Sequence, residues 1–402
     1  MKVTIAPSRA NGTVLAPPSK SMAHRMLMGA GLAEGTSVVE NIDLSEDIKA
    51  TLGMLKALGG QYKIEGHKVI MQGVGGKKLQ TNQKLNSNES GSTLRFFIPL
   101  LLSGGEKAEF TGAKRLLERP LGIYEEICKE QGILFEKSDT GLKVEGQLKA
   151  SHFKVQGNIS SQFITGLLFA LPLLKEDSVL EVLPPVESRA YIDMTLEALQ
   201  TFGIKVRQEG NTFYIAGNQS YQAKDVTVEG DYSNAAFLDA FNLIGGNVNV
   251  TGLREDTLQG DRIYKSYYEV LKEEYPVMDL AECPDLGPIL MGMAAAGNGA
   301  QFTGTRRLRI KESDRGAVMA EELAKFGIQV DVMENEIVVH KGTLVRPNEL
   351  LNSHNDHRIA MTMATLCTIT GGTIDGAESV RKSFPNYYDV IEQLGINVTR
   401  EV

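Results

Sequence analysis

The sequence predicts an α/β fold of two domains, in which apolar helices lie inside and sheets and amphipathic helices surround them. Three observations predict it. Six clusters of small polar or charged residues each precede an almost wholly apolar helix. Amphipathic helices that end at glycine recur in a second register. The apolar helices, such as AAFLDAFNLIG at 235–245 and IAMTMATLCTI at 359–369, have no polar face, and a helix that is apolar all round is buried on all sides.

The six polar clusters recur at intervals of about 70 residues, with one shorter interval before the fifth. They are SKS at 19–21, ESGST at 89–93, NISSQ at 158–162, GDYSN at 230–234, CPDLG at 283–287 and NDHR at 355–358. A helix N-terminus leaves backbone N–H groups unpaired and carries partial positive charge, so each start is a potential anion site. Six such starts, several of them containing Lys or Arg, indicate a protein that holds an anionic small molecule.

The second register consists of helix ends at which glycine supplies the left-handed conformation that closes the helix. The copies are LKALGG at 55–60, CKEQGI at 128–133, LQTFGI at 199–204, LAKFGI at 323–328 and IEQLGI at 391–396, with a degenerate copy, LKEEYPV, at 271–277. An alternating, hairpin-like pattern follows, clearest at 204–217. The repeated unit therefore runs from a polar start through a buried helix, a strand and an amphipathic helix to a pair of strands.

Six units in 402 residues divide into two domains of three units each. The turn-rich GNQSYQAKD at 217–225 is the best boundary. The last unit lacks its second hairpin strand, and the alternating segment Met1–Ala6 can supply it. We therefore expect one domain at 19–227 and a second at 1–18 together with 228–402.

Composition bounds the function. A net charge of −8 with 23% charged residues argues against nucleic acid as the main partner. Cys128, Cys283 and Cys367 are odd in number and far apart, as free thiols of a reducing compartment are. No charged-then-apolar leader precedes the first strand, and the longest apolar stretch, 163–174, is too short to span a bilayer. We expect a cytoplasmic protein without a membrane partner, acting as a monomer.

The densest charged cluster is RRLRIKESDR at 306–315. If 305–311 is a strand, Arg307, Arg309 and Lys311 share one face, because side chains alternate along a strand. Such cations repel one another unless an anion lies between them. A solvated, salt-bridged strand end is the alternative, and we favour anion binding. Ser313 or Asp314 then caps a helix that runs to Phe326.

Three further motifs are weaker when taken singly. PPSKSMAHR at 17–25 places Lys20 at a helix start with Ser19 or Ser21 as the cap, and Arg25 follows one turn later. In SGST at 90–93, Gly91 permits close backbone approach to an anion. ERPLG at 118–122 places Arg119 before a proline, in an extended conformation. A simple capped helix or turn explains each motif about equally well.

HNDHR at 354–358 holds two histidines three residues apart, but a third metal ligand is missing and Arg358 would oppose a cation. We instead expect Asp356 to cap a helix whose start presents His357 and Arg358. In RKSFPNYY at 381–388, Lys382 is an anion-site candidate, although a surface lysine is the simpler interpretation. The candidate proton-transfer groups beside cations are Asp285, Glu312, Lys20 and Lys382.

Taken together, the motifs PSKSMAHR, SGSTLR, ERPLG, SSQF, SRAYID, GDYSNAA, RIKESDR, NDHR and KSFP resemble the 5-enolpyruvylshikimate-3-phosphate synthase family, in order over nearly the whole chain. The resemblance implies a two-domain inside-out α/β barrel of six βαβαββ repeats, three per domain. It implies transfer of the enolpyruvyl group of phosphoenolpyruvate to the 5-hydroxyl of shikimate 3-phosphate, with release of phosphate, on the route to chorismate and the aromatic amino acids. No metal or organic cofactor is implied.

The resemblance also implies roles for individual residues. Glu312 would be the acid, Asp285 with Lys20 the base, and His357 an assistant. Shikimate 3-phosphate would contact Lys20, Ser21, Arg25, Ser160, Ser161, Gln162, Ser188, Tyr191, Asp285, Arg307 and Lys311. Phosphoenolpyruvate would contact Lys20, Gly91, Arg119, Gln162, Arg315, Arg358 and Lys382.

Two departures from the family pattern concern detailed contacts. Glu89 and Ser90 stand where many members have Asn-Ala, and Arg307 stands where many have Asn. The alternative is an enolpyruvyl transferase acting on UDP-N-acetylglucosamine, which uses a loop cysteine as acid and an Asn after its first lysine. Here Ser21 follows Lys20, and Cys128 lies in an amphipathic helix. A non-catalytic module that binds sugar phosphates would keep the anion sites but would need no acid.

Overall fold

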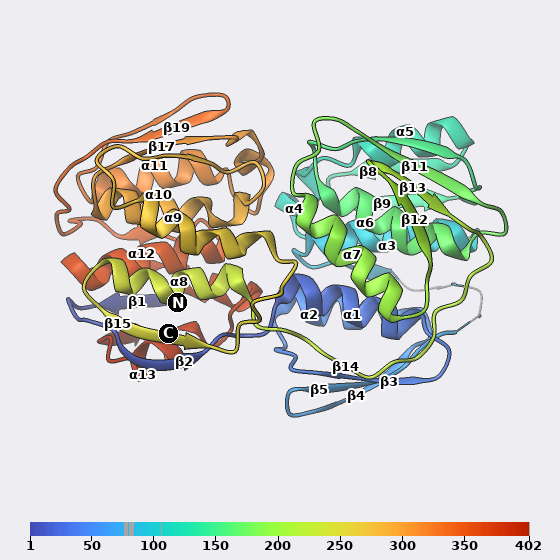
Figure 1. The fold of residues 1–402 in the computed structure, drawn as a ribbon, viewed down its shortest axis with the longest axis horizontal. Helices are drawn as coiled ribbons and strands as arrows, with labels where there is room; N and C mark the ends of the chain where they lie inside the picture. Colours follow the sequence, from blue (N-terminus) through green and yellow to red (C-terminus); the bar gives the residue numbers. More distant parts are fainter. Residues whose placement is uncertain (76–78, 80–83, 106, 402) are drawn as a thin grey trace. The chain divides into compact units, whose positions relative to one another are not determined.

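The computed structural model describes residues 1–75, 79, 84–105 and 107–401 (Figure 1). The chain divides into two compact units. The first unit is Lys20–Glu229, and the second unit is Met1–Ser19 together with Gly230–Val402. Each unit has its own hydrophobic core.

The described part of the first unit contains three sheets of one design, in which a parallel pair of strands is extended by an antiparallel hairpin. Their strand orders are β14-β3-β5-β4, β6-β7-β9-β8 and β10-β11-β13-β12. The strands are β3 (Thr36–Glu40), β4 (Gln61–Glu65), β5 (Lys68–Gln72), β6 (Leu85–Asn86), β7 (Lys107–Thr111), β8 (Leu134–Ser138), β9 (Gly141–Glu145), β10 (His152–Gln156), β11 (Ser178–Leu183), β12 (Val206–Glu209), β13 (Thr212–Ile215) and β14 (Val226–Thr227). Because β14 comes from the end of this unit, the returning chain completes the first repeat.

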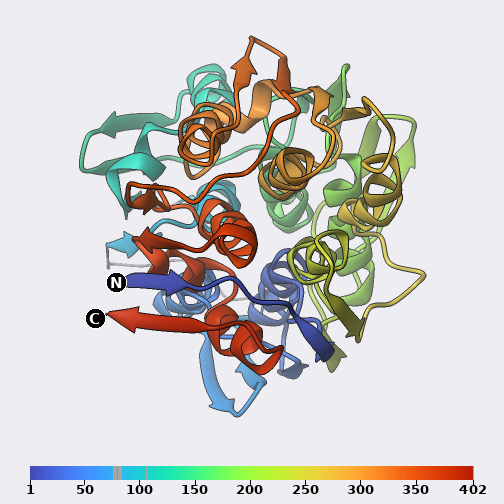
Figure 2. The ribbon, with the colours of Figure 1, turned by 90° about the vertical axis from the view of Figure 1, so that its left-hand side faces the viewer.

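The second unit repeats this design in the sheets β16-β17-β19-β18 and β20-β21-β1-β22, and β2 pairs with β15 in a two-stranded sheet. These strands are β1 (Lys2–Ile5), β2 (Asn11–Leu15), β15 (Asn247–Thr251), β16 (Val277–Asp279), β17 (Ala300–Thr303), β18 (Val330–Val332), β19 (Glu336–Val339), β20 (Leu351–Asn352), β21 (Gly372–Asp375) and β22 (Val398–Glu401). Figure 2 shows β1 running between the two last strands of the chain, and it is antiparallel to both. The N-terminal strand therefore fills the gap left by the incomplete last repeat.

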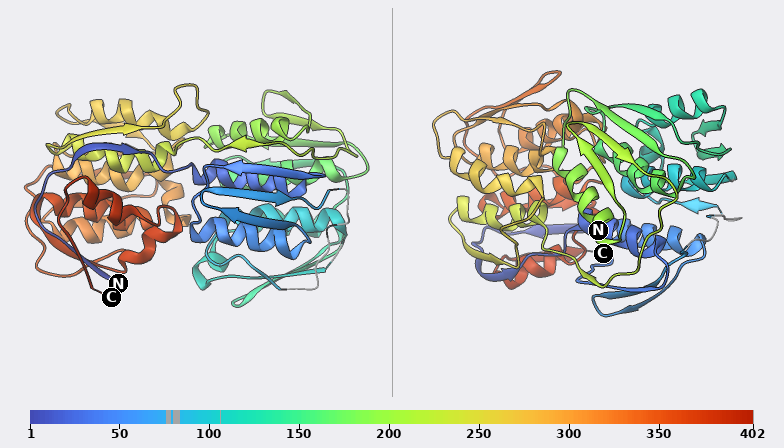
Figure 3. Two further views of the ribbon diagram at one scale, coloured as in Figure 1. Left: turned by 90° about the horizontal axis from the view of Figure 1, so that it is seen from below. Right: turned by 45° about the vertical axis from the view of Figure 1, so that its right-hand side comes forward.

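Among the described residues, six apolar helices form the inside of the two units. They are α1 (Lys20–Leu32), α3 (Gly91–Gly104), α6 (Ser161–Ala170), α8 (Tyr232–Leu243), α10 (Gly287–Ala296) and α12 (His357–Thr370). Every residue of α6 except Gln162 is buried. Within each unit the strands lie outside these helices, as the views in Figure 3 show. No helix in the described part of the chain is long and apolar enough to cross a membrane.

The outer helices are amphipathic, as predicted. They are α2 (Glu46–Ala57), α5 (Gly122–Gln131), α7 (Arg189–Thr201), α9 (Tyr264–Val270), α11 (Arg315–Lys325) and α13 (Tyr387–Gln393), and a short helix, α4, covers Lys114–Glu118. Gly132 has φ 68° and closes α5, and Gly327 has φ 82° just after α11. The predicted α/β fold of βαβαββ repeats is confirmed.

One predicted element is wrong. Residues 305–311 are not a strand, because η4 (Arg306–Ile310) is a 3-10 helix. The preceding strand β17 ends at Thr303, Gly304 then turns the chain at φ 66°, and the Arg306 amide bonds the side chain of Asn335 at 3.0 Å. The three cations therefore do not share a strand face.

Candidate functional site

In the second unit, carboxylates and cations from three helix starts form one cluster. Asp285 lies in η3 (Pro284–Leu286), which leads into α10. Lys311 and Glu312 lie in the loop ahead of α11, which Asp314 caps by accepting the Ala317 amide hydrogen. Asp356 caps α12 by accepting the Arg358 amide hydrogen at 3.0 Å. Both capping predictions are confirmed.

Arg315 organises this cluster. Its side chain is 1% exposed and donates to three carboxylates. Nη1 bonds Asp285 Oδ1, Nη2 bonds Glu312 Oε2 and Nε bonds Asp356 Oδ2, each at 2.8 Å. The planar guanidinium has enough donors in a fixed fork to hold all three at once. Arg315 thereby fixes the positions of the candidate acid Glu312, the candidate base Asp285 and the α12 cap Asp356.

Asp285 is also held by two other cations. Its Oδ1 accepts from Lys311 Nζ at 3.0 Å, and its Oδ2 accepts from Arg358 Nη2 at 3.3 Å. Burial raises the pKa of Asp285, but the charges of Arg358, Lys311 and Arg315 outweigh burial and hold this pKa well below its usual range. Burial lowers the pKa of Lys311 to about 8 despite the nearby Asp285 carboxylate. Asp285 is therefore ionised at neutral pH.

Arg358 is buried, and some of its N–H donors make no hydrogen bond to the described residues. Its Nε and Nη1 atoms have no hydrogen-bond partner in the part of the chain that the structure describes. The guanidinium lies 6.0 Å from the Phe237 ring. A buried guanidinium with unused N–H groups has the chemistry of an anion-binding group, because leaving such donors unpaired is unfavourable.

The remaining predicted residues of this unit lie at its helix ends. Lys382 ends η5 (Ala377–Lys382), is buried and donates to the Asn355 carbonyl. His357 is buried with Nδ1 3.8 Å from Asp356 Oδ1. Arg307 is buried and donates to the Ala281 carbonyl at 3.4 Å, whereas Arg309 turns to the Met333 carbonyl. Because Lys382 is buried, the simpler interpretation of it as a surface lysine is wrong.

In the first unit, α1 begins at Lys20, so Ser19 precedes the helix and Ser21 lies in its first turn. Lys20 Nζ pairs with Asp47 Oδ2 at 2.9 Å. Arg25 is buried and donates to the Ser21 and Tyr191 carbonyls, to Thr195 Oγ1 and to Thr165 Oγ1. Burial lowers the pKa of Arg25 to about 10, so it stays charged at neutral pH. Internal partners therefore fix the orientation of this guanidinium.

The start of α3 and Arg119 lie in contact. Ser90 caps α3 by accepting the Thr93 amide hydrogen at 3.2 Å. A Cβ placed on Gly91 would lie 2.7 Å from Arg119 Nη1, so only glycine fits there without displacing the guanidinium. Arg119 is buried and extended, with ψ 150° before Pro120, as predicted. The glycine thus sets the place of a buried cation.

The α6 start joins the same network. Ser160 caps the helix by accepting the Gln162 amide hydrogen at 3.3 Å, and Ser161 is its first residue. Gln162 accepts from Arg95 Nη1 at 2.6 Å and donates to Ser92 Oγ at 2.9 Å. The amide side chain therefore links the starts of α3 and α6.

The start of α7 carries the last two predicted residues of the first unit. Ser188 precedes the helix with φ 56° and is fully buried. The Tyr191 ring lies 5.8 Å from the Arg25 guanidinium. In the first unit, the predicted residues other than Arg25 and Arg119 therefore lie at or next to the starts of α1, α3, α6 and α7.

Asp261 is a residue that sequence reasoning missed. It lies in η2 (Gly260–Ile263), is 5% exposed, and its Oδ1 has no hydrogen-bond partner among the described residues. Burial, and after it the Asp285 carboxylate, raise the pKa of Asp261 to about 7, although the positive charge of Arg358 opposes this rise. QGD at 259–261 belongs to neither repeated register, so no sequence signal singles it out.

Replacing Asp261 with Asn should stabilise the protein increasingly as the pH rises. The folded pKa of about 7 exceeds the ordinary value of about 3.9, so the folded state keeps a proton that the unfolded state loses in that window. The stability that this proton provides is complete below about pH 4 and is lost as the pH rises through 7. Relative to the native chain, Asp261→Asn should gain roughly 2 kcal/mol between pH 5 and pH 8, measured by urea unfolding. An unchanged pH dependence would contradict this assignment.

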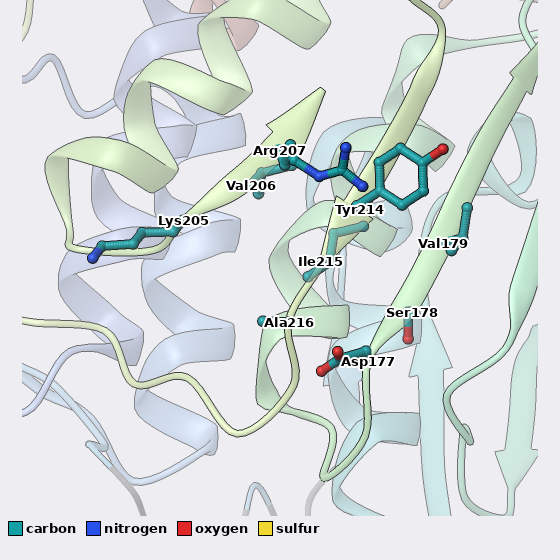
Figure 4. Close-up of a pocket in the computed structure, with 9 residues that line it drawn as sticks. All are labelled: Asp177, Ser178, Val179, Lys205, Val206, Arg207, Tyr214, Ile215 and Ala216. Atoms are coloured by element: carbon teal, nitrogen blue, oxygen red, sulfur yellow. The ribbon is translucent and has the colours of Figure 1, made fainter. Parts of the chain in front are cut away.

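A hollow lies on the sheet β10-β11-β13-β12 (Figure 4). Strands β11, β12 and β13 and the loops beside them line it, and Arg207 lies 3.9 Å from the Tyr214 ring centre. None of the predicted site residues lines this hollow.

The fold and these clusters define a class of protein: a two-unit α/β protein that directs cations and carboxylates from its helix starts, as an enzyme for anionic small molecules does. Comparison with known proteins specifies the class. The family model for EPSP synthase (3-phosphoshikimate 1-carboxyvinyltransferase) matches residues 5–391. The chain belongs to this family, which confirms the family predicted from its motifs.

Relatives match over almost their full length. The 3-phosphoshikimate 1-carboxyvinyltransferase of Clostridium perfringens is 39% identical over 417 residues, covering 98% of each chain. That of Clostridium novyi is 38% identical over 424 residues, covering 98% of this chain and 97% of the relative. The structure of EPSP synthase from Acinetobacter baumannii superposes with a TM-score of 0.78 at 24% identity, covering 99% of this chain and 100% of that one, and supports the fold.

Proposed function

We propose that this protein transfers the enolpyruvyl group of phosphoenolpyruvate to the 5-hydroxyl of shikimate 3-phosphate and releases phosphate, in aromatic amino acid biosynthesis. Membership of the family supports the reaction. The structural observation that carries the proposal is the buried Arg358, with two N–H donor atoms unpaired among the described residues, beside the Asp285, Lys311 and Arg315 cluster. Both substrates are multiply anionic, and such donors suit them.

The substrate contacts in this proposal are assigned residue by residue. Shikimate 3-phosphate takes the hydroxyls and cations at the starts of α1, α6 and α7, together with Asp285, Arg307 and Lys311. Phosphoenolpyruvate takes Gly91, Gln162 and a set of cations, namely Lys20, Arg119, Arg315, Arg358 and Lys382. Because these cations are already held in place, they need to move little when negative charge develops in the transition state.

The proposed reaction is an addition followed by an elimination. Glu312 donates a proton to the methylene carbon of phosphoenolpyruvate while the 5-hydroxyl oxygen attacks the adjacent carbon, and Asp285, with Lys20, takes the hydroxyl proton. The resulting tetrahedral intermediate then loses a proton from its new methyl group and expels phosphate. Arg119, Arg315, Arg358 and Lys382 stabilise the departing charge, and His357 assists.

The cations around Asp285 bear on its role as base. A carboxylate held by three cations has a low pKa and is a weak base. Anionic substrates bound to Arg358 and Lys311 would offset the positive charge that these two cations place on Asp285, and this would raise the pKa of Asp285 at the moment when it must accept a proton. The base therefore strengthens as the substrates bind.

Cys128 argues against the alternative acceptor, UDP-N-acetylglucosamine. It is fully buried in α5, and burial raises the pKa of its thiol to about 12. A thiol in this position has no access to a substrate, so it does not serve as the loop acid that the alternative requires.

Replacing Arg358 with Ala should weaken the binding of phosphoenolpyruvate far more than the binding of shikimate 3-phosphate. Loss of a charge-assisted donor set costs about 1.5–3 kcal/mol, so the KM for phosphoenolpyruvate should rise roughly 10-fold to 100-fold, with a change below about 3-fold for shikimate 3-phosphate. Steady-state kinetics with each substrate varied in turn measures both values. Equal losses for the two substrates would contradict the assignment.

Replacing Gly91 with Ala should act on the same substrate through Arg119. The new methyl group would lie 2.7 Å from Arg119 Nη1 and must displace it. A misplaced cation should raise the KM for phosphoenolpyruvate roughly 10-fold. Gly122→Ala is the matched control, because a Cβ at Gly122 meets nothing within 4 Å. An unchanged KM in Gly91→Ala would show that Arg119 does not hold this substrate.

We further propose that the two units are domains with limits near residues 19 and 228, and that the protein works as a cytoplasmic monomer. The two separate cores support the first proposal, and three buried, free cysteines suit a reducing compartment. Size-exclusion chromatography with light scattering tests the monomer, and a stable dimer would contradict it.

A further inference from the structure

The turn that leads into α12 has an unfavourable backbone conformation. His354 and Asn355, two consecutive residues other than glycine, are left-handed, with φ 48° and 54°. Such a conformation costs of order 1–2 kcal/mol for a residue with a Cβ, although asparagine tolerates it better. Other contacts must therefore hold this turn in place.

Glu322, on α11, makes these contacts. It is fully buried, and both of its carboxylate oxygens are used. Oε2 accepts the Asn352 amide hydrogen at 3.0 Å, before the turn, and Oε1 lies 2.8 Å from His354 Nε2, within it. Lys325 Nζ, one turn along the same helix, bonds Oε1 at 2.8 Å and balances the charge. A single buried carboxylate thus anchors the turn at two points.

This turn positions two parts of the proposed phosphoenolpyruvate site, namely Lys382 and the start of α12. The Asn355 carbonyl accepts a hydrogen bond from Lys382 Nζ. Asp356, the next residue, caps α12 at Arg358 and accepts from Arg315 Nε at 2.8 Å. A shift of the turn would therefore move Lys382 and the start of α12 together.

We propose that Glu322 is a positioning residue that fixes the left-handed turn at 354–355 and, through it, the cations that bind phosphoenolpyruvate. This inference rests on the proposed function. It adds a residue that belongs to none of the proposed substrate contacts.

The same groups do not make a good metal site. Glu321, Glu322 and His354 have potential ligand atoms within 4.8 Å of one another. However, the Lys325 ammonium already occupies Glu322 Oε1, and a second cation on that oxygen would be repelled. The hydrogen bonds of Glu322 therefore favour a role in holding the turn at 354–355 over a role as a metal ligand.

Glu322→Gln tests the proposal, because it keeps the side chain's shape and removes the charge that holds His354. The KM for phosphoenolpyruvate should rise roughly 10-fold, while the KM for shikimate 3-phosphate changes less than about 2-fold. Glu321→Gln is the matched control. It is the neighbouring acid, 59% exposed and 3.8 Å from the same imidazole, and it should leave both values unchanged.

A second variant keeps the test informative if Glu322→Gln fails to fold. His354→Asn retains a residue that tolerates the left-handed turn but loses the bond to Glu322, and it should give the same selective rise. The proposal would be overturned if these variants raised the KM equally for both substrates or raised neither KM. It would also be overturned if a chelator lowered the activity of the native enzyme. An inactive native protein would instead refute the proposed function, so the two failures are distinguishable.

Discussion

Replacing Glu312 with Gln should lower turnover by roughly 10²-fold to 10⁴-fold and leave the affinity for shikimate 3-phosphate almost unchanged. Glutamine still accepts the bond that Arg315 Nη2 donates at 2.8 Å, so the cluster keeps its geometry. It has no proton to give to the methylene carbon. Single-turnover kinetics measures the chemical step, and calorimetry measures binding.

Glu334→Gln is the control for Glu312. Glu334 is an exposed acid near the same loop, 3.8 Å from Arg306, and its loss should not change turnover. If Glu312→Gln turns over as fast as the native enzyme, Glu312 is not the acid. If the variant also fails to bind shikimate 3-phosphate, its role is structural.

Replacing Arg315 with Leu should destabilise the protein by about 3–5 kcal/mol and abolish activity. The side chain is 1% exposed and bonds Asp285, Glu312 and Asp356. Removing one partner of a buried ionic network leaves buried charge poorly compensated, and here three carboxylates lose a shared cation, although Asp285 keeps Lys311 and Arg358. Urea unfolding at pH 7 measures the loss.

Arg306→Leu is the control for Arg315, because Arg306 is a largely exposed arginine of the same charged motif. Its loss should change stability by less than about 0.5 kcal/mol. Equal stability changes in the two variants would show that burial of the Arg315 network does not contribute to the fold.

The sequence predicts much of the fold because the repeat uses local signals. A cap such as Asp314 or Asp356 bonds an amide two or three residues further on, and a glycine such as Gly327 closes its own helix. Both kinds of signal lie within a few residues of the structure they specify. Repetition six times then makes weak signals strong.

What the sequence does not reveal depends on contacts between distant segments. Nothing local shows that Glu322 reaches His354, or that Asp261 is buried near Asp285. The charged run at 305–311 alternates as a strand would, yet Gly304 turns the chain away from the sheet first. Which residues surround a side chain is decided by packing, which periodicity does not encode.

The most direct test of the central claim is a phosphate-release assay with purified protein and phosphoenolpyruvate, run with shikimate 3-phosphate or with UDP-N-acetylglucosamine as acceptor. We predict one phosphate released per shikimate 3-phosphate consumed, and release no faster than background with the nucleotide sugar or with phosphoenolpyruvate alone. No release with shikimate 3-phosphate, or faster release with UDP-N-acetylglucosamine, would contradict the proposed reaction.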